Sequence, residues 1–250
     1  MGSLQFRSLR GIGFALVIGL TTCERCEPTL DQIVQRNAIA VGGKVAIERV
    51  SSIKIDLHVI APDYEVDGTY WAARPGRMRI DIFSKGQRVF TEAFDGARAW
   101  QWKGEGDSVD ESDTATAALR HGVELPGHLF GLHELRGRGH RLELTGQEII
   151  DGSNYYALRV TLSDGYETTL YLDAKSWLIT RRREVRPLHP DRDPTPATIE
   201  TRMSDFRKVN GLYFPFASMD MDLNTSQVLE RTVVRSIQLN PVIDADLFTK

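Results

Sequence analysis

Apolar and polar residues alternate with a period of two along most of the chain. One clear run places Ile53, Ile55 and Leu57 between polar residues, and the alternation recurs over residues 78–82 and 156–162. Successive side chains of a β-strand point to opposite faces of a sheet, so this pattern indicates strands with one dry and one wet face. About a dozen such runs can be found, a number typical of a sandwich, a barrel or a strongly curved sheet.

Short turn signals separate these runs. Asp-Gly and Asn-Gly favour tight hairpins because both residues readily take positive φ. The signals are Pro75-Gly76, Lys85-Gly86, Asp95-Gly96, Asp151-Gly152, Asp164-Gly165 and Asn210-Gly211. Because helical crossovers do not separate the strands, an antiparallel meander is predicted and a parallel α/β fold is disfavoured. The stretch 187–196 (PLHPDRDPTP) is interpreted as a proline-rich loop between two strands.

Two segments depart from the strand pattern. Over residues 29–50 apolar residues recur at three- and four-residue steps behind Thr29, a suitable N-cap, and Gly42-Gly43 interrupts them. We therefore expect two short helices, or one broken helix, packed on the sheet. Residues 104–138 predict a loop, a short helix and a second helical turn after Pro126. This insertion is either a plug or lid, or a helical connection that closes one end of the core.

The N-terminus has the order of an export signal. Arg7 and Arg10 precede an uncharged apolar run over residues 11–20, too short for a permanent span, so residues 1–22 are expected to be a signal peptide rather than a buried helix. Cys23 follows Leu20-Thr21-Thr22, which resembles a bacterial lipobox except that Thr22 replaces the usual Gly or Ala. Either Cys23 is lipidated and becomes the mature N-terminus, or the leader is simply cleaved. Residues 23–28 would form a tether and residues 29–250 a single domain.

The composition argues against nucleic acid as a partner and against a fold held together by disulfides. The formal net charge of −3 is spread over both signs, and Arg181-Arg182-Arg183, interpreted as the solvated end of a strand, is the longest basic run. Nucleic acid is therefore not an expected partner. Only two cysteines occur, both beside the leader, so the fold must depend on its hydrophobic core rather than on disulfides.

Motifs for catalysis are missing from the sequence. No G-x-S-x-G stretch is present, and His121, His128, His133 and His140 lack the i, i+4 spacing that places two imidazoles on one helix face. No phosphate-binding glycine loop appears outside the leader. We therefore predict no catalytic residue, no metal and no cofactor.

Large apolar residues occupy both faces of several predicted strands, as in Tyr70-Trp71 and Val89-Phe90. A sheet with one solvated face needs large apolar residues only on its buried face. Either helices cover the second face, or that face lines a cavity for an apolar ligand. The residues predicted to line such a cavity are Tyr70, Met78, Ile80, Ile82, Phe90, Trp100, Leu158, Val160 and Leu170.

Several short stretches carry a family resemblance through their order along roughly residues 37–250. They are 38–43 (AIAVGG), 75–79 (PGRMR), 93–96 (AFDG), 171–173 (YLD), 206–215 (FRKVNGLYFP) and 240–244 (NPVID). Together they resemble the LolA/LolB-like outer-membrane lipoprotein-sorting family. No functional arginine or insertion-loop residue of that family can be matched to a position here.

The resemblance implies a mainly β (α+β) fold, in which a strongly curved, unclosed, barrel-like antiparallel sheet of about a dozen strands wraps around short helices. It also implies a non-catalytic protein of the periplasm, or of the periplasmic face of the outer membrane, that binds acyl chains of lipids or lipoproteins. A lipidated Cys23 would add membrane association, and a monomer is expected. The alternative is an envelope scaffold or sensor domain with the same fold and a filled cavity.

Overall fold

The computed structural model describes residues 27–189 and 193–250. The predicted signal peptide, the lipidation candidate Cys23 and Cys26 lie outside the described residues. The α-helices are α1 (Leu30–Val41), α2 (Lys44–Glu48) and α3 (Asp113–Glu124), and the 3-10 turns are η1 (Leu132–Glu134), η2 (Arg136–Arg138) and η3 (Ala245–Phe248). Among the described residues, no helix combines the length and apolar character needed to cross a membrane.

The described strands form one antiparallel sheet of 13 strands. They are β1 (Ser52–Ile60), β2 (Glu65–Ala73), β3 (Arg77–Ser84), β4 (Gln87–Phe94), β5 (Ala99–Trp102), β6 (Val109–Asp110), β7 (Arg141–Ile150), β8 (Ser153–Thr161), β9 (Glu167–Asp173), β10 (Ile179–His189), β11 (Asp193–Val209), β12 (Leu212–Asp222) and β13 (Gln227–Leu239). Their spatial order is β6-β5-β4-β3-β2-β1-β13-β12-β11-β10-β9-β8-β7.

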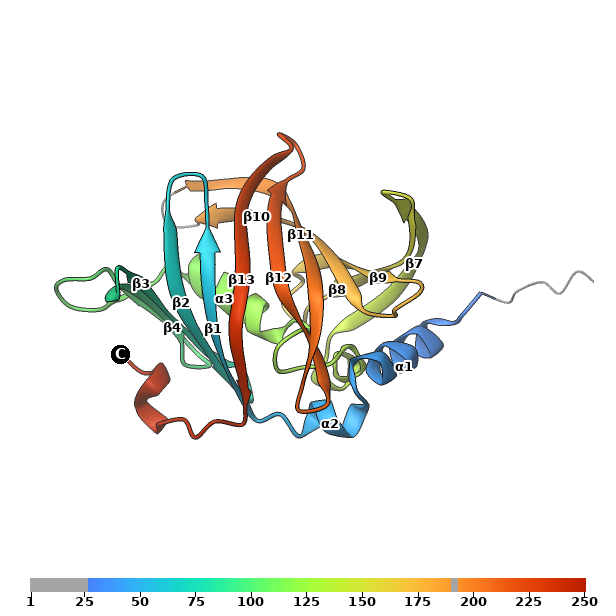
Figure 1. Ribbon diagram of the computed structural model, residues 1–250, viewed down its shortest axis with the longest axis horizontal. Coiled ribbons are helices and arrows are strands. Elements are labelled where there is room, and N and C mark those ends of the chain that lie inside the picture. The colour runs from blue at the N-terminus through green and yellow to red at the C-terminus, as the bar shows by residue number, and fades with distance from the viewer. Residues whose placement is uncertain (1–26, 190–192) are drawn as a thin grey trace, which may run out of the picture.

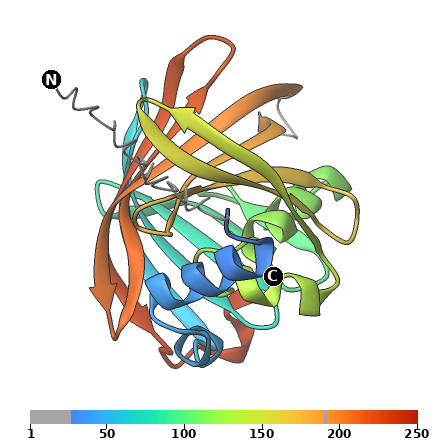
Figure 2. The same ribbon diagram turned by 90° about the vertical axis from the view of Figure 1, so that its right-hand side faces the viewer.

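The first and last strands meet in the middle of this sheet, where β1 pairs with β13. The edge strands β6 and β7 are joined by the segment that contains α3, which crosses the concave side (Figure 1). The sheet curves strongly without closing, and α1 and α3 lie inside the curve (Figure 2). The predicted fold class is therefore confirmed: a mainly β, unclosed and curved antiparallel sheet surrounds short helices.

The predicted helix break at Gly42-Gly43 separates α1 from α2. Thr29 caps α1 through a capping box with Gln32, as its residue type favours. Gly42 has φ +136°, and a Cβ at this position would lie 2.5 Å from the carbonyl oxygen of Gly211. The junction of the two helices therefore packs directly against the turn between β11 and β12, an approach that only glycine permits.

The core is divided into two apolar clusters on the concave side. The first joins α2 and the inward residues of β1–β4 to β12, and includes Ile47, Ile53, Met78, Phe94 and Phe214. The second joins α1, η1 and η2 to β7–β9, and includes Ile33, Leu132, Leu135, Leu158, Val160 and Leu170. The alternation of the strands directs these side chains inward, as the period of two predicts.

The C-terminal turn η3 covers part of the convex face. Phe248 is only 1% exposed, and Nε1 of Trp100 donates a hydrogen bond to its carbonyl oxygen at 2.9 Å. Arg79 of β3 donates a hydrogen bond to the carbonyl oxygen of Leu247. Trp100 lies between Ala99 and Gln101 in β5, which both face inward, so its indole points to the convex side.

The prediction of a loop over residues 187–196 is wrong, because β10 runs to His189 and β11 starts at Asp193. Pro187 lies opposite Pro196 across the hairpin. The prolines are tolerated because this end of the hairpin extends beyond its neighbours: β9 pairs with β10 only up to Glu184, and β12 pairs with β11 only from Ile199. No neighbouring strand needs the missing N–H groups there.

Candidate functional site

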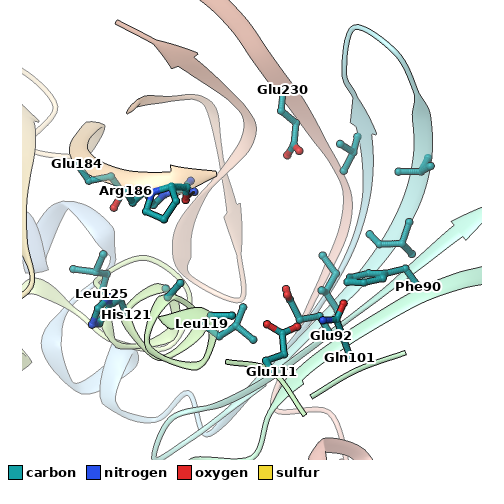
Figure 3. A pocket seen from close by; sticks show the side chains of 18 of the residues that line it. Phe90, Glu92, Gln101, Glu111, Leu119, His121, Leu125, Glu184, Arg186 and Glu230 are labelled. Atoms are coloured by element: carbon teal, nitrogen blue, oxygen red, sulfur yellow. Dashed lines mark hydrogen bonds and ion pairs between the residues drawn. The ribbon is translucent and has the colours of Figure 1, made fainter. Parts of the chain in front are cut away.

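A cavity of about 920 Å³ lies on the concave side between α3, strands β2–β4 and strand β10 (Figure 3). A smaller cavity of about 340 Å³ lies beside it, enclosed by α1, α2, residues 126–132 and strands β10–β13. Gly122, Leu125 and Arg182 line both cavities. Each cavity taken separately has the volume of a small-molecule site, for which ligand pockets of ~300–1,000 Å³ are typical.

One wall of the larger cavity is apolar. Ile80 and Ile82 of β3 and Phe90 of β4 point into it because they occupy the inward positions of the alternation. Leu119 of α3 lies across the cavity from Phe90 (Figure 3), and Ala118 of the same helix also lines the cavity. A hydrocarbon chain could pack against these side chains, although Glu92, the cross-strand partner of Ile80, brings a carboxylate to the same wall.

The wall formed by β10 is charged. Arg182, Glu184 and Arg186 alternate along the strand and all line the larger cavity. The side chain of Glu184 is 3% exposed, and it accepts hydrogen bonds from Nε of Arg186 at 2.8 Å and from the hydroxyl of Tyr166. Burial by itself would raise the pKa of Glu184, but the charges of Arg182 and Arg186 outweigh burial and lower it. Glu184 is therefore a buried carboxylate.

Carboxylates also reach the larger cavity from the other strands. Glu230 of β13 projects into the space, and Glu92 of β4, Gln101 of β5 and Glu111 group on another side of it (Figure 3). Burial raises the pKa of Glu230, and the nearby Asp220 adds to the effect. The cavity therefore combines an apolar wall with polar groups, and could accommodate an amphiphile.

Helix α3 is fixed across the concave side by its C-terminal half. His121 lies 2.7 Å from Asp164 in the turn between β8 and β9, and its ring stacks on Tyr166 with a centroid distance of 4.1 Å. Arg120 binds the same carboxylate. Burial alone would raise the pKa of Asp164, but hydrogen bonds from His121, the Tyr166 amide and Arg120 lower it to about 2. The predicted insertion thus forms a wall of the cavity and is tied to the far half of the sheet.

Many residues that line the smaller cavity are apolar, and its aromatic polar residues include Tyr70 and His128. Their rings lie 5.1 Å apart. Burial lowers the pKa of the His128 imidazole to about 4, with Arg182 adding to the shift. Burial likewise raises the pKa of Tyr70. Both side chains are therefore neutral at physiological pH.

The structure distributes the nine predicted cavity residues over four locations. Ile80, Ile82 and Phe90 line the larger cavity, and Tyr70 and Leu170 line the smaller one. Met78, Leu158 and Val160 pack in the apolar clusters beside the cavities. Trp100 lies on the convex face under η3.

Sequence reasoning missed the charged wall of β10. The interpretation of Arg181-Arg182-Arg183 as a solvated strand end is wrong: the side chain of Arg181 is 10% exposed and binds Glu200 at 2.9 Å on the convex face. Arg182 points the other way, into the cavities. The alternation of Arg182, Glu184 and Arg186 is visible in the sequence. Tyr166, whose hydroxyl donates a hydrogen bond to Glu184, lies in the turn between β8 and β9, and no local pattern connects it with β10.

The four histidines between residues 121 and 140 are not brought together. His121 binds Asp164, the ring of His128 is tilted against that of Tyr70, and His133 lies 3.2 Å from Glu48. Nδ1 of His140 accepts a hydrogen bond from the amide of Ser163. Over residues 27–189 and 193–250, no group of three or more His, Cys, Asp or Glu side chains is placed to hold a metal ion.

Comparison with solved structures finds a similar fold in several bacterial proteins. A LolA superfamily protein from Nitrosomonas europaea is 14% identical, with a TM-score of 0.57 over 88% of this chain and 97% of that chain. A DUF1329 family protein from Desulfovibrio piger is 10% identical, with a TM-score of 0.58 over 87% and 96%. A domain from Vibrio parahaemolyticus, whose name assigns it to outer membrane lipoprotein sorting, is 9% identical, with a TM-score of 0.56 over 87% and 94%.

No family model and no curated protein sequence matches the chain. The likeness is therefore one of three-dimensional structure, and the resemblance seen in the short sequence stretches is confirmed at that level. The structural likeness extends over almost the whole length of these proteins, and this chain, with its 13-stranded antiparallel sheet, has the LolA-like fold.

Proposed function

We propose that this protein binds acyl chains of lipids or lipoproteins inside its curved sheet and catalyses no reaction. The observation that carries the proposal is the cavity of about 920 Å³ with the apolar wall of Ile80, Ile82 and Phe90, next to a second cavity of about 340 Å³. The LolA-like fold supports the same conclusion, since structures of that fold include a protein named for outer membrane lipoprotein sorting.

Hydrophobic transfer is sufficient to drive such binding. Each buried CH₂ contributes about 0.8 kcal/mol, so a dozen methylenes contribute about 10 kcal/mol before the cost of ordering the chain. A carrier needs no covalent step to extract a lipid on this basis. Specificity would then depend on the size of the cavity and on its polar groups.

The place of action that we propose is the cell envelope, in lipoprotein sorting or lipid transport. The support is the export pattern of residues 1–22 together with the fold. With a lipidated Cys23 the protein would be tethered to a membrane and act as a receptor. With a simply cleaved leader it would act as a soluble periplasmic carrier.

The test compares the wild type with two variants of α3. Ala118 lines the larger cavity, whereas Ala117, its neighbour on the same helix, does not. Ala118→Phe fills the space with a phenyl ring and is expected to weaken binding of an acyl-chain fluorophore at least about tenfold, equivalent to about 1.4 kcal/mol. Ala117→Phe makes the same chemical change away from the cavity and should bind like the wild type.

Native mass spectrometry of gently purified wild-type protein supplies the second readout. Adducts of acyl-lipid mass, reduced in Ala118→Phe and retained in Ala117→Phe, are expected. A wild type with a clean apo mass and no fluorophore binding would refute lipid binding. The scaffold or sensor interpretation would then replace it.

A further inference from the structure

Arg182 lies at the boundary between the two cavities and has hydrogen-bonding capacity to spare. It lines both cavities from the middle of β10. One terminal nitrogen lies 3.2 Å from Glu184. Its Nε is buried and has no hydrogen-bond partner among the described residues. A guanidinium group carries five N–H donors, so a buried N–H without an acceptor marks a position where an acceptor on a ligand would be stabilised.

A second polar atom next to Arg182 is also buried and also lacks a hydrogen-bond partner among the described residues. Thr201 of β11 is the cross-strand partner of Arg182, and its side chain lines the smaller cavity. Its hydroxyl is also buried, without a hydrogen-bond partner in the described part of the chain. Directly opposed residues of an antiparallel pair have Cβ atoms about 4.5–5.5 Å apart, so one ligand group can reach both side chains.

The acceptor next to Arg182 is already engaged by other donors. Glu184 accepts hydrogen bonds from Arg186 and Tyr166, and Arg186 also lies 3.8 Å from Asp220. His128, whose pKa is lowered by burial and by Arg182, is neutral and adds no competing charge.

Apolar side chains line the cavities on both sides of this boundary. Leu125 faces both cavities, Leu119 and Ile80 line the larger one, and Leu170 and Ile179 line the smaller one. A polar group held at Arg182 would therefore have room for a hydrocarbon chain next to it. This combination is the pattern of an amphiphile site, in which a few polar groups orient a mostly apolar ligand.

We propose that Arg182 and Thr201 form a head-group subsite for an anionic amphiphile, a molecule with a carboxylate or phosphate group on an acyl chain. The anionic oxygens accept hydrogen bonds from Nε of Arg182 and from the hydroxyl of Thr201, and the chain extends into the apolar parts of the cavities. This inference rests on the proposed function and adds the class of ligand to it.

The test measures competition by palmitate and by methyl palmitate for a bound acyl fluorophore. The two ligands share a chain and differ in charge at the head. Wild-type protein is expected to prefer palmitate at least about tenfold, which corresponds to about 1.4 kcal/mol. Arg182→Gln should reduce this preference to about twofold or less, and Thr201→Val, which keeps the shape of the side chain, should reduce it in part.

Arg183→Gln is the matched control. Arg183 neighbours Arg182 on β10, has a side chain of similar exposure (29% against 25%) and also pairs with a glutamate, but it faces the convex side. This variant should keep the full preference for palmitate. Thermal unfolding of each variant establishes that it is folded, and Thr201→Val supplies the readout if Arg182→Gln does not fold.

The outcomes separate the subsite from the proposed function. Equal wild-type affinity for palmitate and methyl palmitate would refute the subsite and leave acyl-chain binding intact. A wild type that binds neither ligand would refute both. Inorganic phosphate distinguishes an amphiphile from a free anion: if millimolar phosphate binds in an Arg182-dependent manner while palmitate does not, the proposed ligand class is wrong.

Discussion

Two histidine residues make the free energy of unfolding depend on pH, in opposite directions. Burial and Arg182 lower the pKa of His128 to about 4, so the folded protein disfavours its charged form. Hydrogen bonds to Asp67 and Glu65 raise the pKa of His58 on the convex face. A lowered histidine pKa makes the unfolded chain bind more protons at mildly acid pH, whereas a raised one makes the folded chain bind more.

His128→Gln is expected to make the protein less sensitive to acid. In the wild type the contribution of His128 to stability is complete above about pH 6.5 and is lost as the pH falls towards about 4, because only the unfolded chain is protonated in that window. The difference in urea midpoint between pH 7 and pH 5 should therefore shrink in the variant.

His58→Gln is a control variant, for which we expect the opposite change in the pH dependence of stability. The stability that His58 contributes is complete below its unfolded pKa and is lost as the pH rises through its folded pKa. This variant should widen the difference in urea midpoint between pH 7 and pH 5. Equal pH dependence of the wild type and His128→Gln would contradict the assignment of a buried, neutral His128.

At the scale of elements, the position of α1 and α2 depends on how closely their junction approaches the sheet. Gly42 and Gly43 both have positive φ, +136° and +104°. A Cβ on Gly42 would lie 2.5 Å from the Gly211 oxygen and 2.8 Å from a methyl carbon of Leu212, whereas a Cβ on Gly43 would have no atom within 4 Å. Substitution of Gly43 therefore introduces backbone strain alone, whereas substitution of Gly42 introduces both backbone strain and a steric clash.

Gly42→Ala is expected to destabilise the protein more than Gly43→Ala. Both variants incur backbone strain of roughly 1–3 kcal/mol, because L-residues rarely adopt such a φ. Gly42→Ala adds a clash with backbone that can be relieved only by moving α1 away from the turn between β11 and β12. Chemical denaturation measures both losses, and equal losses would show that the junction tolerates the displacement.

Sequence patterns predicted these elements well where local chemistry decides them. The helix break follows from Gly42-Gly43, the start of α1 from Thr29, and the strand faces from the period of two. The errors concern residues 187–196 and Arg181-Arg182-Arg183, whose surroundings come from other strands. Local patterns carry no information about where neighbouring strands end or which face holds a buried partner.

In the whole molecule, the first and the last strand of the described chain pair with each other in a single sheet. β1 pairs with β13, and the side-chain oxygen of Asn240 accepts from the Ser51 amide at 2.7 Å, which fixes the end of this central pair. The far edges are connected only through the segment of α3, which His121 and Arg120 tie to Asp164. A ligand between α3 and the sheet would contact both halves and should stabilise them together.

Acyl-ligand binding is therefore expected to raise the melting temperature of the protein. At a free concentration of 100 times Kd, binding to the folded state alone adds about 2.7 kcal/mol. For a chain of this size, that corresponds to roughly 5–10 °C. Ala118→Phe should show a much smaller shift at the same ligand concentration. A wild type whose melting temperature does not respond to palmitate in differential scanning fluorimetry would argue against a ligand inside the sheet.

Local sequence patterns specify the strand periodicity, the turns, the helix break and the presence of more apolar residues than a one-faced sheet needs, because each of these depends on neighbours within a few residues. Which of those apolar residues face open space depends on contacts between parts of the chain that are distant in sequence. Ile80 and Trp100 look alike as inward candidates, yet one lines the larger cavity and the other packs under η3. The same holds for the charged wall of Arg182, Glu184 and Arg186. It lines one cavity together with α3 and the strands of the other half because the sheet is curved.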